Sequence, residues 1–289
     1  MSKATWSLKL IEALDRRYKP RDYEIPILLK YAQMNKLLLG FLRAADINDD
    51  RFHEEERYKW FMDNTIEVIK VINNLNYALY KFRKPIDNVS VDLDVLIDVK
   101  DVHKAVSKLR ELKFKIVVVE PYTITLVRRG FIVDLYTHPA FAWIVYMNGE
   151  LLLKDYVEDF YVNGFPAKSL TKEAEVVVSM AHAIYKEHMY LLIDHILMKK
   201  WFCKGIWRIA EEFKVSKAIE KALEISRLID HGFIEVPYKI PFKEVLKLYI
   251  YKALEDEIFR ATTPNILKYM LLRGGGWRKV YWRLKRETY

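Results

Sequence analysis

The sequence has few of the residues that build a disulfide framework, a cysteine-rich metal site or a membrane span. Cys203 is the single cysteine, which excludes both an internal disulfide and a multi-cysteine metal site. We interpret it as a small packing residue in a reducing compartment. The longest apolar run, residues 140–147, falls far below the roughly 20 residues that cross a bilayer. The sequence therefore predicts a protein without membrane spans.

The sequence also has almost no glutamine, and it has no glycine-rich phosphate-binding loop. Gln33 is the single glutamine, whereas Lys, Glu, Ile and Tyr are plentiful, a composition expected of a hyperthermophile. The one glycine run, Gly274-Gly275-Gly276, lacks the Lys-Ser/Thr of a phosphate-binding loop and follows no predicted strand, so we interpret it as a flexible joint. The sequence starts Met-Ser-Lys-Ala-Thr-Trp, without an apolar stretch and cleavage site, and we expect a cytoplasmic protein.

Positive charge is what the chain has in excess. The formal net charge of the 289 residues is +9, and the segment 273–289 has six cationic side chains against Glu287, a net charge of +5. Aromatic residues alternate with these cations. Cations attract a phosphate backbone and aromatic rings stack on bases, so the tail predicts a nucleic-acid partner such as RNA. Two alternatives are an amphipathic element that docks on the protein itself and, less favoured, one at a membrane surface.

The periodicity of apolar residues predicts an α/β (α+β) fold, in which a small mixed β-sheet is flanked by N-terminal helices and a helical C-terminal domain. Expected helices cover residues 24–46, 52–74, 101–112, 172–200, 206–230 and 242–259. Expected strands cover residues 77–82, 91–99, 114–120, 122–127, 130–136 and 140–147. We expect four parts: N-terminal helices (1–74), an α/β core (75–164), a helical domain (165–272) and a basic aromatic tail (273–289). The core should end near Gly164-Phe165-Pro166.

The residues that point to chemistry are three aspartates. Asp92 and Asp94 are two apart on one predicted strand, so both side chains lie on the same face while Leu93 and Val95 face a core. Adjacent carboxylates repel each other and need a cation, and oxygen ligands favour Mg²⁺ or Mn²⁺. Asp134 is the one acid in a later apolar strand, and it completes the cluster if the two strands are neighbours. The alternative interpretation is a solvated pair of acids at a strand end.

Basic residues accompany the acids in sequence. Lys81, Arg83 and Lys84 directly precede the loop to Asp92, and we expect them to neutralise a triphosphate; a solvated loop is the alternative. His182 and Lys186 share one face of a predicted helix and could reach a bound phosphate. The alternative for these two is a partly buried histidine and a solvated lysine.

The segment from Tyr77 to Tyr136 resembles the DNA polymerase β-like nucleotidyltransferase superfamily. The resemblance rests on Val91-Asp92-Leu93-Asp94-Val95, on Val133-Asp134-Leu135, and on the helical region that follows. It implies metal ligation by Asp92 and Asp94, with Asp134 as a ligand or general base. More loosely, the chain resembles archaeal nucleotidyltransferase-like proteins, which pair a strand like Tyr77-Ala-Leu-Tyr-Lys with a helix like the segment 171–188.

The sequence departs from the superfamily at the turn after its first strand. The superfamily holds phosphate there with Gly-Ser, and this chain has Lys81-Phe82-Arg83-Lys84-Pro85 instead. The resemblance implies Mg²⁺-dependent transfer of a nucleotidyl group from an NTP to an acceptor hydroxyl on RNA such as tRNA, a protein or a small molecule. The competing prediction is a catalytically inactive scaffold that binds nucleic acid. An Asp-x-Asp glycosyltransferase is a third, weaker alternative, because no nucleotide-sugar domain surrounds the motif.

Overall fold

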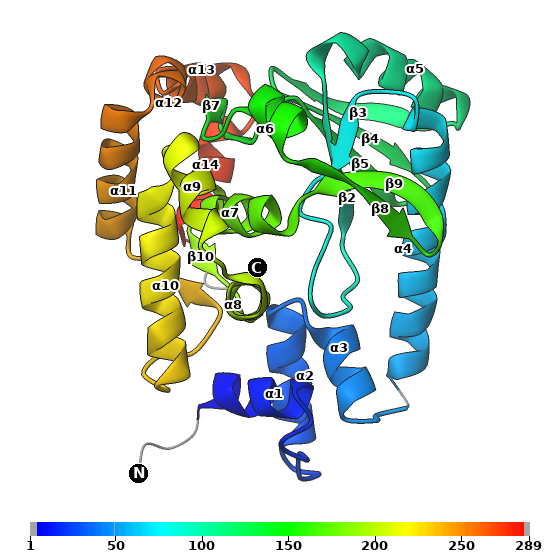
Figure 1. Cartoon of the computed structure of the whole chain (residues 1–289), viewed down its shortest axis with the longest axis vertical. Coiled ribbons are helices and arrows are strands. Elements are labelled where there is room, and N and C mark those ends of the chain that lie inside the picture. Colours follow the sequence, from blue (N-terminus) through cyan, green and yellow to red (C-terminus); the bar gives the residue numbers. More distant parts are fainter. Residues whose placement is uncertain (1–4, 49, 286–289) are drawn as a thin grey trace.

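The computed structural model describes residues 5–48 and 50–285, with the backbone alone at 279 and 284. The chain has a mixed α+β fold, as predicted, in which helices surround a seven-stranded sheet (Figure 1). The sheet has the order β3-β4-β5-β2-β1-β9-β8. The strands are β1 (Tyr77–Leu79), β2 (Asp92–Ile97), β3 (Lys115–Glu120), β4 (Thr123–Arg128), β5 (Phe131–Tyr136), β8 (Val157–Val162) and β9 (Phe165–Leu170).

Strand β2 lies near the middle of the sheet, parallel to β5 on one side and antiparallel to β1 on the other. On one face, Leu93, Val95 and Ile97 are fully buried against α4 (Arg51–Ile72) and α5 (Val102–Glu111). This alternation is the one predicted for the segment, with the even-numbered positions facing the opposite way. Leu96, on the opposite face, belongs to the larger apolar core that includes α7 (Lys172–His182).

The N-terminal part is more broken than the sequence predicts. The single helix expected over 24–46 is wrong, because two helices, α2 (Ile25–Met34) and α3 (Leu38–Ala44), replace it, after α1 (Trp6–Leu14). The break falls at Asn35, whose buried amide donates to the carbonyl of Val236 and accepts from the backbone N–H of Leu192. These bonds tie the N-terminal helices to the C-terminal half, below the sheet in Figure 1.

Two further expected elements are also interrupted. The strand expected over 140–147 is a tight hairpin of β6 (Ala140–Phe141) and β7 (Ile144–Val145), because Ala142 and Trp143 adopt positive φ. The helix expected over 172–200 is wrong as one piece: α7 runs into a π-helical turn at Ala183–Glu187. His188, with a φ of 54°, then redirects the chain into β10 (Met189–Tyr190) and α8 (Leu192–Trp201).

The end of the core expected near Gly164 falls inside the sheet. Asn163 and Gly164, with φ of 47° and 80°, form the turn of the β8–β9 hairpin, and β9 pairs with β1. The sheet thus continues past the expected boundary, since Asn-Gly turns match the twist of a two-residue hairpin. The short helix α6 (Gly149–Asp155), capped by Asn148, precedes this hairpin.

Helices make up most of the remaining chain, on the left of Figure 1. The helices expected over 206–230 and 242–259 are each divided, the second at Asp256, which caps the next helix. The elements are α9 (Gly205–Glu212), α10 (Ser216–Asp230), β11 (Tyr238–Lys239), α11 (Phe242–Glu255), α12 (Glu257–Thr262), α13 (Asn265–Leu272) and α14 (Gly276–Lys285). In α14, Val280 is buried in the larger core, so the helical part of the basic tail packs on the protein.

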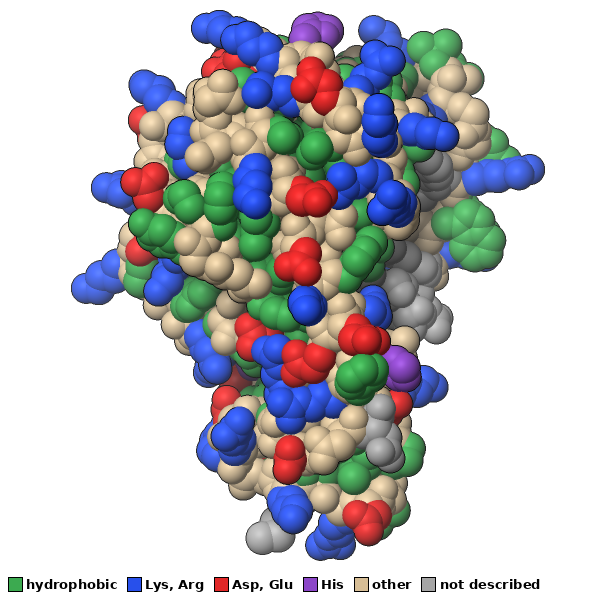
Figure 2. Space-filling view, turned by 90° about the vertical axis from the view of Figure 1, so that its right-hand side faces the viewer, with side chains coloured by type: hydrophobic (Ala, Val, Ile, Leu, Met, Phe, Trp, Pro, Cys, Tyr) green, Lys and Arg blue, Asp and Glu red, His purple; other side chains and the backbone are tan. Residues whose placement is uncertain are grey.

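The molecular surface mixes charges of both signs. On the face that Figure 2 shows, Lys and Arg side chains are interspersed with acidic and hydrophobic ones. None of the helices in the described part of the chain combines the length and the apolar character that a membrane crossing requires.

Candidate metal centre

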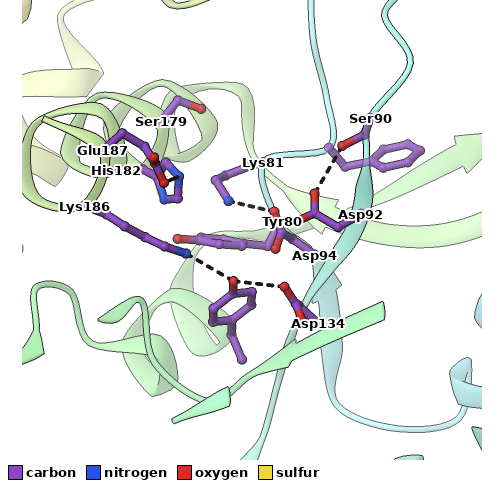
Figure 3. Close-up of polar contacts among 12 residues, drawn as sticks. Tyr80, Lys81, Ser90, Asp92, Asp94, Asp134, Ser179, His182, Lys186 and Glu187 are labelled. Atoms are coloured by element: carbon purple, nitrogen blue, oxygen red, sulfur yellow. Dashed lines mark hydrogen bonds and ion pairs between the residues drawn. The ribbon is translucent and has the colours of Figure 1, made fainter. Parts of the chain in front are cut away.

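The three aspartates predicted from the sequence converge at one place. Strands β2 and β5 are parallel neighbours in a register that sets Asp94 opposite Asp134, and Asp92 lies two residues before Asp94 on the same face. One carboxylate oxygen from each residue lies within 4.8 Å of the others. Parallel pairing therefore produces the acidic cluster directly (Figure 3). We refer to Asp92, Asp94 and Asp134 as the acidic triad.

The triad is poorly solvated and crowded with negative charge. Asp94 is 8% exposed, and its Oδ1 has no hydrogen-bond partner among the residues described. The charge of Asp94, followed by burial, raises the pKa of Asp92. Burial, followed by the charge of Asp94, raises the pKa of Asp134 to about 6. Both shifts disfavour the ionised carboxylates, so an added cation would be stabilised here.

Asp134 is held in place by polar neighbours. The hydroxyl of Thr125, its partner across β4–β5, donates to Oδ1, and the Tyr136 hydroxyl lies 3.4 Å from Oδ2. The Nζ of Lys186 in turn donates to the Tyr136 hydroxyl at 3.2 Å. Figure 3 shows this chain running from Lys186 to Asp134. Such hydrogen bonds fix the orientation of a carboxylate that serves as a ligand or base.

Lysines face the triad across the site. The Nζ of Lys81 lies 2.7 Å from Asp94 Oδ2, and Lys81 follows β1 with a φ of 56°. Burial, with the charge of Lys81, lowers the pKa of Lys186 to about 7 and that of Lys36 to about 8. The cations therefore repel one another, as the carboxylates do. The two groups lie side by side, and a metal-bound phosphate would add a cation next to the carboxylates and an anion next to the lysines.

Arg83 and Lys84 reach the same region, but their charged groups are held by other residues. The Arg83 guanidinium pairs with Glu158 and stacks 4.8 Å from the Phe160 ring centroid. The Nζ of Lys84 donates to the Ser179 hydroxyl at 3.2 Å, and burial lowers the pKa of Lys84. Neither is directed at the triad as Lys81 is, so the site does not bring all three predicted cations together.

The turn after β1 holds an internal anion. The backbone N–H groups of Phe82 and Arg83 donate to Oε1 of Glu175 at 3.1 and 3.4 Å. Glu175 comes from the first turn of α7 and is fully buried, which raises its pKa to about 7. A carboxylate of the protein thus occupies the position that backbone donors of such a turn offer to phosphate.

His182 lies in a network beside Lys186. Its Nδ1 is 3.2 Å from the Tyr146 hydroxyl, and its Nε2 is 3.2 Å from Glu187 Oε1. Burial and then the charges of Lys81 and Lys186 lower its pKa well below the ordinary value, so the imidazole is neutral at pH 7. Both His182 and Lys186 remain at the site despite the π-helical turn that separates their backbones.

A cleft of about 540 Å³, which we call the main cleft, opens over the triad and these cations. Its lining includes residues that we did not identify from the sequence, since they come from segments without a distinctive motif. They are Lys36 between α2 and α3, Tyr136 in β5, Glu187 in the π-helical turn, Asp194 in α8 and Arg283 in α14. Arg283 lies 3.5 Å from Glu187, so the last helix takes part in the site.

Comparison with known proteins gives no family assignment. No protein-family model matches the chain, and no curated protein is significantly similar to it in sequence.

Proposed function

We propose that this protein is a divalent-metal-dependent nucleotidyltransferase, which moves a nucleotidyl group from an NTP to an acceptor hydroxyl. One observation carries the proposal: three crowded carboxylates face a group of crowded lysines across a cleft. The cluster attracts cations and the opposite side attracts anions. A metal–triphosphate complex combines the two charges in the same arrangement.

The residues of the triad fit Mg²⁺ or Mn²⁺. The donors are carboxylate oxygens alone, which these hard cations prefer over nitrogen or sulfur. The unpartnered, buried Oδ1 of Asp94 is the clearest sign, because a buried acceptor without a donor is costly unless a cation binds it. Asp92 and Asp94 would hold the metal, and Asp134 would complete the set. When bound, the metal would stabilise negative charge on the phosphate oxygens and on the attacking and leaving oxygens.

The reaction assigns separate tasks to the protein's residues. The acceptor oxygen forms a bond to the α-phosphorus, the bond from that phosphorus to the β-phosphate oxygen breaks, and pyrophosphate leaves. Asp134 accepts the proton of the acceptor hydroxyl. Lys81 and Lys186 neutralise the phosphates, since both lie beside the triad with little solvent to compete. His182, neutral at pH 7, holds the Tyr146 hydroxyl and Glu187 beside the cleft.

The setting that we propose is the cytoplasm of a thermophilic archaeon. The support is the single thiol of Cys203 and the Lys/Glu-rich, glutamine-poor composition. Cys203 is exposed, so its interpretation as a packing residue is wrong. The acceptor that we favour is RNA, because the basic helix α14 contributes Arg283 to the site.

A second candidate is a catalytically inactive scaffold that binds nucleic acid. The observation that favours it is Glu175, which occupies the backbone donors of the turn where the superfamily holds phosphate. An enzyme would have to hold the triphosphate through its lysines, whereas a scaffold needs no phosphate position there.

One experiment separates the two. The full chain is incubated with total RNA, Mg²⁺ or Mn²⁺, and each α-labelled NTP in turn, beside Asp92→Asn and a matched control, Asp159→Asn. Asp159 is exposed on β8 and lies outside the cleft. We expect label transfer by the wild type and the control, and a loss of at least about 100-fold in Asp92→Asn, because the ligand supports several kcal/mol of charge stabilisation. No transfer with any NTP, alongside RNA binding that Asp92→Asn leaves unchanged, would establish the scaffold.

A further inference from the structure

A second cavity is also lined by Asp134. It has a volume of about 730 Å³, within the range of about 300–1,000 Å³ typical of ligand sites. Four residues line both this cavity and the main cleft: Asp134, Tyr136, Lys186 and Arg283. Asp134 of the acidic triad therefore lies in the wall of both hollows.

The wall of the second cavity combines cations with aromatic rings. Arg278 and Trp282 are exposed and lie four residues apart on α14, so they share one face of that helix. Trp282 is 64% exposed, an unusual state for the largest aromatic side chain. The guanidinium of Arg283 lies over the ring of Phe141, with its Cζ 5.4 Å from the ring centroid.

The charge balance of this wall favours an anionic occupant. Its cations are Arg273, Arg278, Arg283 and Lys186, and its acids are Glu120 and Asp134. Glu120 is already paired with Arg273 at 2.8 Å. Cations beside exposed aromatic rings are the combination that grips a phosphate backbone while bases stack.

We propose that the second cavity binds the end of a single-stranded nucleic acid, with its terminal hydroxyl directed at Asp134, a base stacked on Trp282 and a phosphate on Arg278. This inference rests on the proposed function and names its acceptor site. In-line displacement needs the attacking and leaving oxygens on opposite sides of the phosphorus. Because Asp134 lines both cavities, an NTP in the main cleft and an acceptor strand in the second cavity would meet at this residue.

The test begins with binding in the absence of NTP. A fluorescein-labelled single-stranded RNA of about 12 nucleotides, and DNA of the same sequence, are titrated with the full chain at several salt concentrations. The variants are Trp282→Ala, Trp282→Phe and Arg278→Ala. Phe52→Ala and Arg110→Ala are matched controls, because both residues are exposed and neither lines a cavity described above.

We expect Trp282→Ala to weaken binding by about 5- to 100-fold and Trp282→Phe to restore much of it, since a phenyl ring still stacks. Arg278→Ala should weaken binding. It should also reduce the slope of log K against log salt concentration by about the amount expected for the loss of one phosphate contact. A 4-thiouridine at the 3′ end should cross-link to β6 or α14. In the transfer assay, Trp282→Ala should raise the KM for RNA and leave the KM for NTP unchanged.

Three results would overturn the inference. Trp282→Ala could bind as tightly as Phe52→Ala, or the 3′ end could cross-link within the main cleft. Alternatively, neither nucleic acid binds and transfer labels a protein in a Trp282-dependent manner, which would make the cavity a protein site. Failure of the proposed function is distinct: binding that depends on Trp282 without any transfer keeps the strand site and removes the transferase.

Discussion

Replacement of Asp134 by asparagine should make the metal-free protein more stable and remove its response to metal. The pKa of Asp134 is raised from 3.8 to about 6, mainly because the carboxylate is buried and then because Asp94 is close. Asparagine has the same shape, and its carbonyl oxygen can still accept from the Thr125 hydroxyl. The substitution therefore removes a buried charge that destabilises the folded state and keeps the hydrogen bond from Thr125 that positions the side chain.

The magnitude follows from the shift. About two pKa units at about 1.4 kcal/mol each give an upper limit of about 3 kcal/mol at pH 7.5. Asp134 keeps some contact with solvent, which screens its charge, so we expect about 1–3 kcal/mol. For a chain of this size, that is a rise in Tm of roughly 2–6 °C.

The pH dependence has a fixed sign. The Asp134 carboxyl has a higher pKa in the folded state than in the unfolded state, so as the pH rises it loses its proton in the unfolded state first. Its destabilising effect on the folded state therefore grows between pH 3.8 and about 6 and reaches its full size above pH 6. The gain from Asp134→Asn should therefore be full at pH 7.5 and about half as large at pH 5. Unfolding followed by circular dichroism in EDTA measures it, with Asp159→Asn as the control.

The same measurement with Mn²⁺ tests the metal site. A ligand that binds the folded state alone, at a concentration 100 times its Kd, stabilises that state by about 2.7 kcal/mol. The wild type should show a shift of this order, and Asp134→Asn should show little of it. An Asp134→Asn protein that is no more stable than the wild type at pH 7.5, or that responds equally to Mn²⁺, would refute the reasoning.

Three further predictions concern the triad and its surroundings. First, Mn²⁺ affinity measured by calorimetry should fall as pH drops from 7.5 to 5, with proton release, because the pKa values of Asp92 and Asp134 are raised and the metal must displace protons; constant affinity would contradict this. Second, the Tm of Glu175→Gln minus the Tm of the wild type should be larger at pH 8 than at pH 5. Burial raises the pKa of Glu175 to about 7, so the wild type acquires a buried charge over this interval. A Tm difference that is the same at both pH values would count against this. Third, Gly149→Ala should lower the free energy of unfolding, measured by urea titration, by at least about 2 kcal/mol, because a Cβ there would lie 1.9 Å from the Thr137 carbonyl oxygen. The control Gly274→Ala, where a Cβ would have no atom within 4 Å, should change the free energy of unfolding by less than about 0.5 kcal/mol.

The pair Asp92 and Asp94 could be predicted because a short-range pattern determines it. Asp92 and Asp94 share a face through the two-residue period of a strand, and Leu93 and Val95 confirm that period by their burial. The strands expected over 122–127 and 130–136 are β4 and β5, and Gly130 in the turn between them takes the positive φ that glycine favours. The sequence did not specify that β5 would pair with β2, which is a long-range choice.

The breaks in the helices were harder to predict because tertiary contacts cause them. Asn35 interrupts its helix through bonds to residues more than 150 positions away. His188 adopts a left-handed conformation without a glycine or proline to signal it. By contrast, the Asn163-Gly164 turn carried a clear hairpin signal, and interpreting that segment as a domain boundary overlooked it. Lys36 and Arg283 were missed because nothing local distinguishes a cleft lysine or arginine from a solvated one.

The contribution of Arg283 to the site has a consequence for biosynthesis. Lys81 and Arg283 are separated by about 200 residues, and ribosomes add roughly 5–20 residues per second, so roughly 10–40 s pass between their synthesis. During that interval a nascent chain can form the β2–β5 pair and gather its carboxylates while α14 is still unmade. The three carboxylates of the acidic triad can then come together before the Arg283 guanidinium that lines the same cleft has been synthesised.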